Sequence, residues 1–304
     1  AKLYEENDLI KNTFRSIGLN LAGYIRGILW TIPIGFIIGL YPLFKGMYQR
    51  TLDAVRFVPI AAAIGIFIAW FGISSSMKVN FLAFGIFIFL SPIVVQRINE
   101  VKDVYLKTVY TIGATDWQSI WSVYIPSVFS KLIDDIRILT AISWTYIVVI
   151  ETINSEEGGL GALTWTARRL SRPENVFALL LLIILIGIIQ DRIFVRLDKE
   201  LLPHKYQGKN QDRYGQLKKP QIIETFLDFA FSAFIWILLA IYVMLAINEF
   251  TGILSDIKLI KYLFGKTSWS FHFIMIAIII YKLRKIYIYY SSKTIAESHA
   301  ETVS

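Results

Sequence analysis

The residue types that perform catalysis or bind metals do not cluster in this sequence. The three histidines, His204, His272 and His299, show no metal-ligand spacing with one another or with carboxylates. The chain has no cysteine, which excludes thiolate metal sites and cysteine nucleophiles. We find no nucleophile–base arrangement either. The sequence therefore predicts a chain that is not an enzyme, with no catalytic residue, no cofactor and no metal of its own.

One short stretch partly matches a nucleotide-binding loop. Gly265, Lys266 and Thr267 resemble the end of a P-loop, but Ile260 stands where that motif requires a glycine. The stretch also lies between two apolar segments. We therefore do not expect this chain to hydrolyse ATP.

The composition points to a membrane protein. Of the 304 residues, 55% are apolar and 18% are charged, whereas soluble domains average about 45–50% and about 25%. Several uncharged segments reach the length of about 17–25 residues that crosses a bilayer. Backbone groups in hydrocarbon must be bonded internally, so each segment is expected to be helical. The prediction is an all-α, polytopic transmembrane helical bundle of about seven spans, at residues 27–44, 57–77, 79–96, 138–150, 175–190, 229–248 and 267–281.

The distribution of Lys and Arg predicts the orientation. One alternating set of connections carries about twice as many of these residues as the other set, and the richer set belongs in the cytoplasm. This places the first residues outside and the C-terminus inside, so we expect a further helix upstream. The net charge of +8 is explained in the same way, and nucleic-acid binding is not expected.

The chain divides into regions of different composition. An extracytoplasmic segment, 1–16, precedes a transmembrane domain at 17–203 that holds five spans. A polar, basic stretch at 204–224 contains Gly and Pro and is predicted to be a cytoplasmic linker. Residues 225–304 form an appended two-helix hairpin with a tail. Small residues at every fourth position of the first span predict close packing against another helix, namely Gly23, Gly27, Thr31, Gly35 and Gly39.

The most informative segment lies between the third and fourth spans, within a loop at 97–137. Gly113 suits the left-handed position after a helix end. Thr115 and Gln118 have the spacing of a capping box, and Asp116 lies in the first turn of the helix that follows. Pro126 suits the first turn of the next helix.

The short helix expected at 115–124 has one aromatic face. Trp117, Ile120, Trp121 and Tyr124 follow one another at helical spacing. Such a face can rest on lipid headgroups or dock into a groove of a cytoplasmic partner. Periodicity does not distinguish these two alternatives.

The segment from Gly113 to Gln118, with Pro126 thirteen positions after Gly113, resembles the EAA loop of permease subunits of binding-protein-dependent ABC importers. The similarity runs from about residue 23 to 203. Other stretches are similar to the aliphatic sulfonate, nitrate and taurine branch, at 32–35, 56–59, 70–73, 158–161 and 165–168, with Glu151 between them.

The resemblance implies that the helix at 115–124 is the coupling helix of an importer. Lys107-Thr108-Val109 stands where the family has an acidic residue and two small ones, which changes the expected salt bridge with the ATPase. Permeases of that branch usually have six spans, one of which precedes the span that is first in this chain. The residues implied in ATPase coupling are Lys107, Gly113, Ala114, Thr115, Asp116, Trp117, Gln118, Ile120, Trp121 and Pro126.

The resemblance also implies the partners and the cargo. ATP and Mg²⁺ would be bound by cytoplasmic ABC ATPase subunits, a second permease copy would complete a homodimer or pseudo-dimer, and an extracytoplasmic binding protein would deliver the solute. The chain would lie in the bacterial inner membrane and carry a small, anionic solute of the sulfonate, nitrate or taurine type by alternating access.

Four residues are candidates for the translocation pathway: Glu151, Trp144, Arg168 and Arg26. Glu151, at the outer end of the fourth span, would pair with Arg168 or another arginine, or line the exit. Arg26 would attract an anion or extend its charge to the membrane surface.

Two other classes of function stay open at this stage. An ATP-independent secondary transporter or channel is expected to show inverted repeats with matching broken helices, and no such symmetry is recognisable in the sequence. A membrane scaffold would use the hairpin at 225–304 to recruit other proteins.

Overall fold

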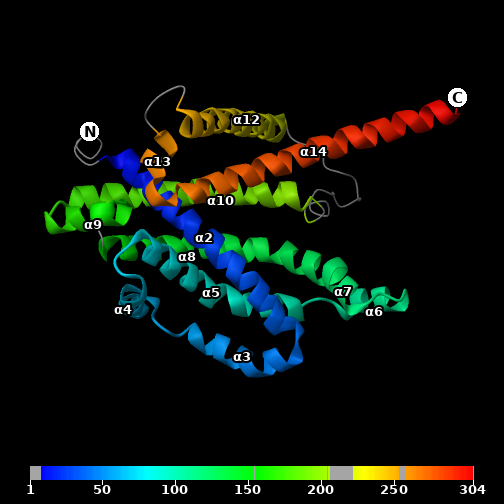
Figure 1. The fold of residues 1–304 in the computed structure, drawn as a ribbon, viewed down its shortest axis with the longest axis horizontal. Helices are drawn as coiled ribbons and strands as arrows, with labels where there is room; N and C mark the ends of the chain where they lie inside the picture. The colour runs from blue at the N-terminus through cyan, green and yellow to red at the C-terminus, as the bar shows by residue number, and fades with distance from the viewer. Residues whose placement is uncertain (1–7, 154, 204, 206–221, 253–257, 304) are drawn as a thin grey trace. The chain divides into compact units, whose positions relative to one another are not determined.

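The computed structural model describes residues 8–153, 155–203, 205, 222–252 and 258–303 (Figure 1). These residues are helical wherever they are regular, and no strand occurs among them. The chain divides into two compact units, Ala1–Lys219 and Pro220–Ser304. The first unit contains α2 (Leu9–Leu40), α3 (Pro42–Val55), α4 (Ile60–Phe71), α5 (Ser75–Asn99), α6 (Asp103–Thr111), α7 (Asp116–Ser119), the π-helix η1 (Ile120–Tyr124), α8 (Ile125–Ile153), η2 (Ser155–Glu157), α9 (Leu160–Arg169) and α10 (Pro173–Leu201).

In the part of the chain that the structure describes, six helices are long and apolar enough to cross a membrane, or seven if one bent pair counts as a span. This confirms the expected all-α membrane bundle. The candidate spans are α2, α5, Asp116–Ile153, α10, Ser232–Thr251 and Leu259–Ile288, with α3 and α4 as the bent pair.

The glycine pattern of α2 explains its packing against α5. A Cβ atom on Gly23 would lie 2.6 Å from Cβ of Leu82, and one on Gly35 would lie 2.7 Å from Cβ of Val94. The two backbones therefore approach more closely than larger residues would permit. The expected close packing is confirmed, and α5 is its partner.

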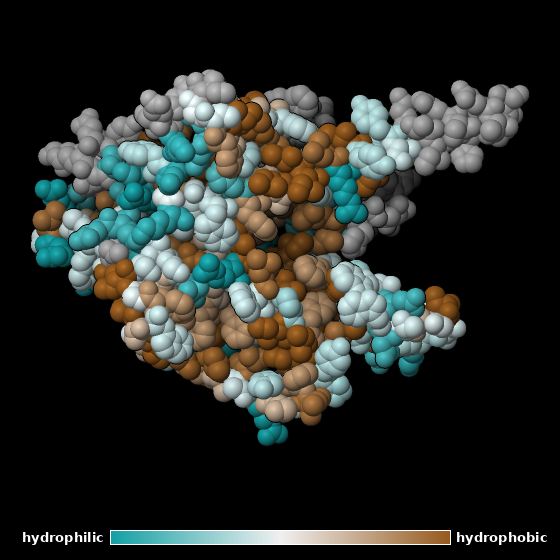
Figure 2. Space-filling view, in the orientation of Figure 1, coloured by the Kyte–Doolittle hydropathy of each residue, from teal (hydrophilic) through white to brown (hydrophobic). Residues whose placement is uncertain are grey.

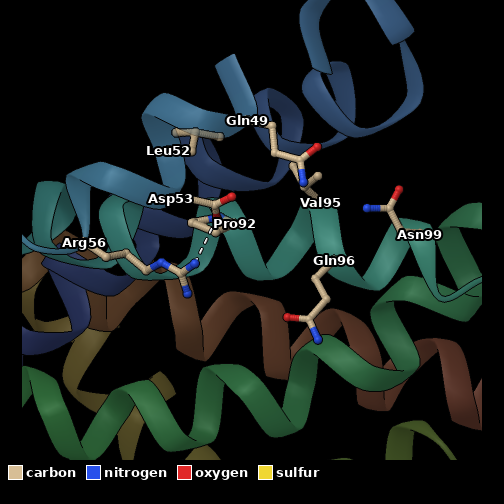
Figure 3. Close-up of a pocket in the computed structure, with 8 residues that line it drawn as sticks. All are labelled: Gln49, Leu52, Asp53, Arg56, Pro92, Val95, Gln96 and Asn99. Atoms are coloured by element: carbon tan, nitrogen blue, oxygen red, sulfur yellow. Dashed lines mark hydrogen bonds and ion pairs between the residues drawn. The ribbon is translucent and has the colours of Figure 1, made fainter. Parts of the chain in front are cut away.

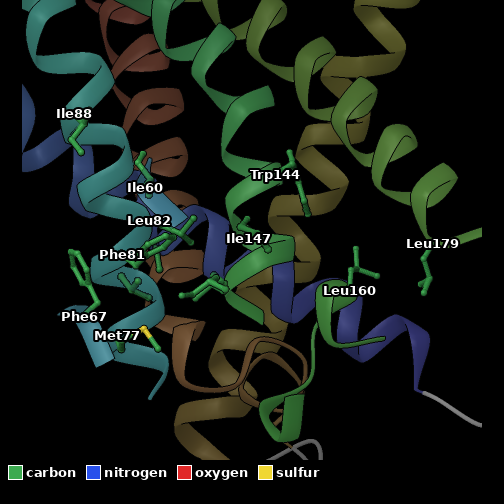
Figure 4. Close-up of a cluster of buried hydrophobic side chains, with 14 residues drawn as sticks. Ile60, Phe67, Met77, Phe81, Leu82, Ile88, Trp144, Ile147, Leu160 and Leu179 are labelled. Carbon is green, nitrogen blue, oxygen red and sulfur yellow. The ribbon is translucent and has the colours of Figure 1, made fainter. Parts of the chain in front are cut away.

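The main hydrophobic core lies where α2, α4, α5, α8, α9 and α10 meet (Figure 4). Phe67 packs edge-on against Phe81, with ring centroids 5.7 Å apart. Ile147 and Leu160 are fully buried in the same cluster. This core fixes the end of α8 near Glu151 and the start of α9 relative to α5.

The second expected span is not one straight helix. Residues 57–77 were predicted to form one span, but only α4 (Ile60–Phe71) and the first residues of α5 are helical within them, and α4 meets α3 at a bend of 106°. Pro59 precedes α4, and a proline disfavours helical backbone at the residue before it. Hydropathy alone does not place this break, but Pro59 near the start of the run is a local signal for it.

The first span also has other bounds than expected. α2 begins at Leu9 and ends at Leu40, whereas an uncharged segment at 27–44 was predicted. Tyr41 is extended and Pro42 begins α3. Proline cannot donate the backbone hydrogen bond that would continue α2, so the chain turns there.

Helix α10 has a largely exposed apolar surface. Only Leu179 and Asp198 of its 29 residues are buried, while Phe177 and Leu181 are each 67% exposed. In the space-filling view, hydrophobic residues cover much of the visible surface between more polar patches (Figure 2). Such a surface is typical of a protein that faces lipid.

The second unit contains α12 (Ile222–Thr251), α13 (Leu259–Phe264), the 3₁₀ turn η4 (Gly265–Thr267) and α14 (Ser268–Val303). Phe264 and Phe271 stack with ring centroids 4.5 Å apart. The hydroxyl of Tyr242 lies 3.0 Å from Nδ1 of His272 and joins α12 to α14. The N-terminal residues 1–7 and most of the linker expected at 204–224 lie outside the described residues.

Candidate functional site

The loop between α5 and α8 contains the helix–break–helix that the sequence predicts. Gly113 ends α6 with φ of +81°, in the left-handed region. The amides of Gly113 and Ala114 donate to the carbonyls of Tyr110 and Val109, at 3.0 and 3.1 Å. These bonds satisfy carbonyls at the end of α6 and fix the direction in which α7 begins.

The capping box at the start of α7 is confirmed. The amide of Gln118 donates to the Thr115 hydroxyl at 3.3 Å, and the Thr115 amide donates to Oε1 of Gln118 at 2.8 Å. In addition, the hydroxyl of Tyr110 donates to Oδ1 of Asp116 at 2.9 Å and joins α6 to α7. The turn is therefore held from both sides.

The helix after the cap differs from the expected separate segment. α7 passes through the π-helical turn η1 directly into α8, and Asp116–Ile153 forms a single helical run. Pro126 lies in the first turn of α8, as predicted, but no break precedes it. A π-helical turn is wider than an α-helical one and leaves room for the proline ring, which would otherwise clash with the preceding turn.

Two tryptophans protrude from this rigid element. Trp117 is 65% exposed and Trp121 is 56% exposed, and their rings meet edge to face at 5.9 Å. Ile120 and Tyr124 are half-buried, while Ser119 and Val123 are buried on the opposite side. Lys107 and Pro126 are exposed, and Ala114 is half-buried. The helix therefore presents an exposed aromatic face, as the spacing predicts.

A charged network lies directly behind the loop, and the sequence did not reveal it. Arg97, near the end of α5, donates to both carboxylate oxygens of Asp135 on α8, at 2.7 and 2.8 Å. Arg97 and Lys131 also bind Glu100, at 2.9 and 2.8 Å. The hydrogen bond from Lys131, followed by that from Arg97, lowers the pKa of Glu100 to about 2.

Glu151 is almost fully buried and fixes a turn of the backbone. Its Oε1 accepts from the Ser16 hydroxyl at 2.6 Å, and its Oε2 accepts from the Gly161 amide at 2.7 Å. Ser16 in turn accepts from the amide of Leu160 at 2.8 Å. Gly159 has φ of +113° and its position leaves no room for a Cβ beside the Glu151 carboxyl group. The glycine-rich segment therefore packs on this carboxylate.

The expected pairing of Glu151 with an arginine is not found. Among the described residues no ion pair joins it to Arg168, which is exposed on α9. Ser16 and the Gly161 amide supply the hydrogen bonds that an arginine was expected to supply. The sequence did not indicate Ser16, which lies 135 positions away.

Two other pathway candidates connect neighbouring helices. Nε1 of Trp144 donates to Gln190 at 2.9 Å and joins α8 to α10. Arg26 donates to Asn80 at 2.5 Å and joins α2 to α5. These contacts show a structural role for both side chains, and their role in transport stays a prediction.

A polar cleft between α3 and α5 was not anticipated (Figure 3). Asp53 and Arg56 form an ion pair at 2.8 Å on its α3 side. The spacing of Lys45, Gln49, Asp53 and Arg56 on one helical face is the signal that could have indicated it. The cleft has a volume of about 200 Å³ and is lined by Gln49, Leu52, Asp53, Arg56, Pro92, Val95, Gln96 and Asn99.

Long apolar helices joined by an exposed, capped loop define a multi-pass membrane protein. Residues 31–202, more than half of the chain, match the family described as binding-protein-dependent transport system inner membrane component. The chain belongs to this family, and it is a permease subunit of an ABC importer. The chemistry of this class is transport, which agrees with the expectation that the chain is not an enzyme.

Named relatives come from archaea and bacteria. A putative ABC transporter permease of Methanocaldococcus jannaschii is 29% identical over 60% of this chain and 69% of the relative. The taurine transport system permease protein TauC of Escherichia coli is 25% identical over 60% and 66%. A putative aliphatic sulfonates transport permease protein, SsuC of Bacillus subtilis, is 27% identical over 64% and 76%.

A solved structure shares the fold. A chain of the MetNI methionine ABC transporter, in an inward-facing conformation, superposes with a TM-score of 0.57 at 14% identity. The match covers 63% of this chain and 95% of that chain. The importer-type helical arrangement is therefore present here.

Proposed function

We propose that this permease forms the route for a small anionic solute of the sulfonate, nitrate or taurine type. The similarity to permeases named for taurine and aliphatic sulfonates supports this substrate class. An extracytoplasmic binding protein delivers the solute, and a second permease copy completes the route. Cytoplasmic ABC ATPase subunits bind ATP and Mg²⁺ and drive the cycle.

The exposed aromatic face of α7 and η1 is the observation that carries the proposal. Trp117 and Trp121 present large apolar surfaces on a helix held by a capping box. Aromatic anchors at helical spacing suit a groove in a partner protein. This face, with Lys107 on α6 beside it, is the docking site for the ATPase in our proposal.

The continuity of α7, η1 and α8 suits force transmission. A displacement of Trp117 passes into α8 without a flexible joint, because the helical run is unbroken. The Arg97–Asp135 pair then passes the motion to α5. Alternating access follows if closure of the ATPase dimer favours one of two bundle arrangements.

Of the pathway candidates, Arg168 has the exposed position that a role in binding requires. Glu151, Trp144 and Arg26 hold helices together, which supports a structural role for these three side chains.

Alanine replacement of exposed tryptophans tests the docking proposal. Trp117 and Trp30 are both 65% exposed, and Trp30 lies on α2. We expect Trp117→Ala to abolish co-purification with the ATPase and ATP-driven taurine uptake into vesicles that contain the binding protein. Trp30→Ala is the matched control and retains both.

Two outcomes contradict the proposal. Wild-type ATPase association by the Trp117→Ala variant removes the docking role of this face. Taurine uptake that persists after nucleotide depletion favours an ATP-independent transporter or channel instead.

A further inference from the structure

We propose that the cleft between α3 and α5 is a water-filled part of the solute route, and that Arg56 is its anion-binding group. The inference rests on the proposed transport function and adds the location and chemistry of a solute site. The cleft is shown in Figure 3, where Asp53 of α3 and Arg56, directly after α3, lie beside Pro92 of α5, and Gln96 also lines the cleft.

The contacts of α3 and α4 with α5 indicate how deep the cleft lies in the membrane. α3 lies along the Asn99 half of α5, because Lys45 donates to Asn99 at 2.5 Å and Leu52 packs with Val95. α4 lies along the Ser75 half, where Phe67 meets Phe81. The bend at 56–59 therefore lies beside the middle of a candidate span. Asp53 and Arg56 line the cleft with Pro92 to Asn99, so they lie beside the last third of α5 and do not extend beyond its end.

The exposure of the Asp53 and Arg56 side chains indicates what surrounds the cleft. The Asp53 and Arg56 side chains remain 48% and 42% exposed in this chain. Charged side chains inside a membrane are costly next to lipid and face protein or a water-filled cavity. Interrupted helical backbone at this depth follows the same rule. The surface of α3 that carries Asp53 and Arg56 must therefore meet water or a second permease copy, not hydrocarbon.

The cleft is continuous with a second hollow along α3. A second, more open hollow of about 730 Å³ lies along the start of α3 and shares Gln49 and Asp53 with the cleft. Lys45 and Arg50 line it. This second hollow is a shallow surface lined by α3 alone, and it continues the polar surface of the cleft toward the start of α3.

The polar groups of the cleft indicate the kind of ligand that it would bind. A guanidinium binds an oxyanion through paired N–H donors, and the amides of Gln49 and Gln96 add further polar groups to the cleft. Asp53 occupies the guanidinium at 2.8 Å in this structure. A sulfonate or carboxylate of a small solute would replace Asp53 as the partner of Arg56. The site therefore suits small solutes with one anionic group.

Cysteine accessibility tests this inference, and the chain contains no native cysteine. Single variants Gln49→Cys and Gln96→Cys are made in the full chain in inside-out vesicles and treated with membrane-impermeant methanethiosulfonates. Leu181→Cys, at an apolar position of α10 that is 67% exposed, is the matched control. We expect both cleft positions to react and the control to stay unmodified until the membrane is dissolved.

The rates of cysteine modification by anionic and cationic reagents report the effect of the Arg56 charge. In the Gln49→Cys background, Arg56→Gln is expected to slow an anionic reagent by about threefold or more relative to a cationic reagent of similar size. Arg56→Lys is expected to retain most of the preference. Equal slowing of both reagents overturns the assignment of Arg56.

Cleft cysteines as unreactive as Leu181→Cys overturn the water-filled route. Reaction at position 49 without reaction at position 96 also overturns it, and assigns α3 to the membrane surface. The labelling needs neither ATPase nor solute, so its result is independent of the docking test. If Trp117→Ala retains the ATPase while the cleft cysteines react as expected, the proposed docking function is contradicted and the cleft proposal is not.

Discussion

Arg97 and Asp135 connect α5 to α8 through two parallel hydrogen bonds, from Nη2 to Oδ1 at 2.7 Å and from Nε to Oδ2 at 2.8 Å. Asp135 is 8% exposed, so its carboxylate depends on this partner. Asp135 lies near the middle of the helical run Asp116–Ile153 that carries Trp117. The pair therefore holds α5 and α8 together at this level.

Replacing Arg97 with lysine tests the geometry of this pair. Lysine keeps the charge but cannot form the two-pronged contact, so one oxygen of a buried carboxylate loses its donor. We expect Arg97→Lys to lower the free energy of unfolding by about 1–3 kcal/mol. Lys131→Gln, which breaks a more exposed pair with Glu100, is expected to cost about 0–1 kcal/mol. Denaturant unfolding in detergent measures the free energy of unfolding of both variants. Equal losses of stability would contradict the role of the two-pronged Arg97–Asp135 contact.

The low pKa of Glu100 gives a pH dependence of defined sign. Its pKa is about 2 in the folded chain, below the ordinary value of 4.5. The folded state thus binds fewer protons, and the stabilisation is present above pH 4.5 and is lost as the pH falls toward 2. Unfolding from pH 7 to 3 is measured for the wild type and Glu100→Gln. We expect the gap between their stabilities to narrow below pH 4.5, and a constant gap would refute the shift.

The turn around Gly159 tests the role of Glu151. Gly159 has φ of +113°, and a Cβ there would collide with the Glu151 carboxyl group. Gly159→Ala is expected to cost more than about 2 kcal/mol, through strain and collision together. Gly187 on α10 has no atom within 4 Å of a Cβ position and is the control. Similar thermal stability of Gly159→Ala and Gly187→Ala would show that the turn tolerates rearrangement.

The left-handed backbone of Gly113 tests the proposed docking role of the loop between α5 and α8. A Cβ at this position meets no atom within 4 Å, so the effect of a substitution comes from φ of +81° alone. Gly113→Ala is expected to cost about 1–2 kcal/mol locally and to weaken ATPase binding. Asn tolerates this backbone better and should restore most of the binding. Affinity for the ATPase in detergent distinguishes the two, and identical loss in both variants would contradict the backbone explanation.

Much of the loop between α5 and α8 could be predicted from the sequence because its determinants are local. The Thr115–Gln118 capping box and the left-handed Gly113 involve residues three positions apart or fewer. Helical spans follow from uncharged runs in the same way. The π-helical connection to α8 could not be predicted, because it depends on how Pro126 is accommodated by the surrounding turns.

The contacts that organise the bundle are remote in sequence. Glu151 meets Ser16 across 135 positions, and Arg97 meets Asp135 across 38. Local patterns identify such residues as costly to bury but do not choose their partners. The bend between α3 and α4 has a local determinant, Pro59, which directly precedes α4, but its angle is not given by the sequence. An uncharged run at 57–77 satisfies the length of a span, while the polar face of α3 lies in the connection before it.

Accessibility of Gln118 tests the central claim, that α7 docks on a cytoplasmic ATPase. Gln118 is exposed and lies between the two tryptophans in sequence. A Gln118→Cys variant is labelled with a membrane-impermeant thiol reagent in inside-out and right-side-out vesicles, with and without the ATPase. We expect labelling only in inside-out vesicles, and protection when the ATPase is bound. Labelling from the outer side, or labelling that the ATPase leaves unchanged, would contradict the account.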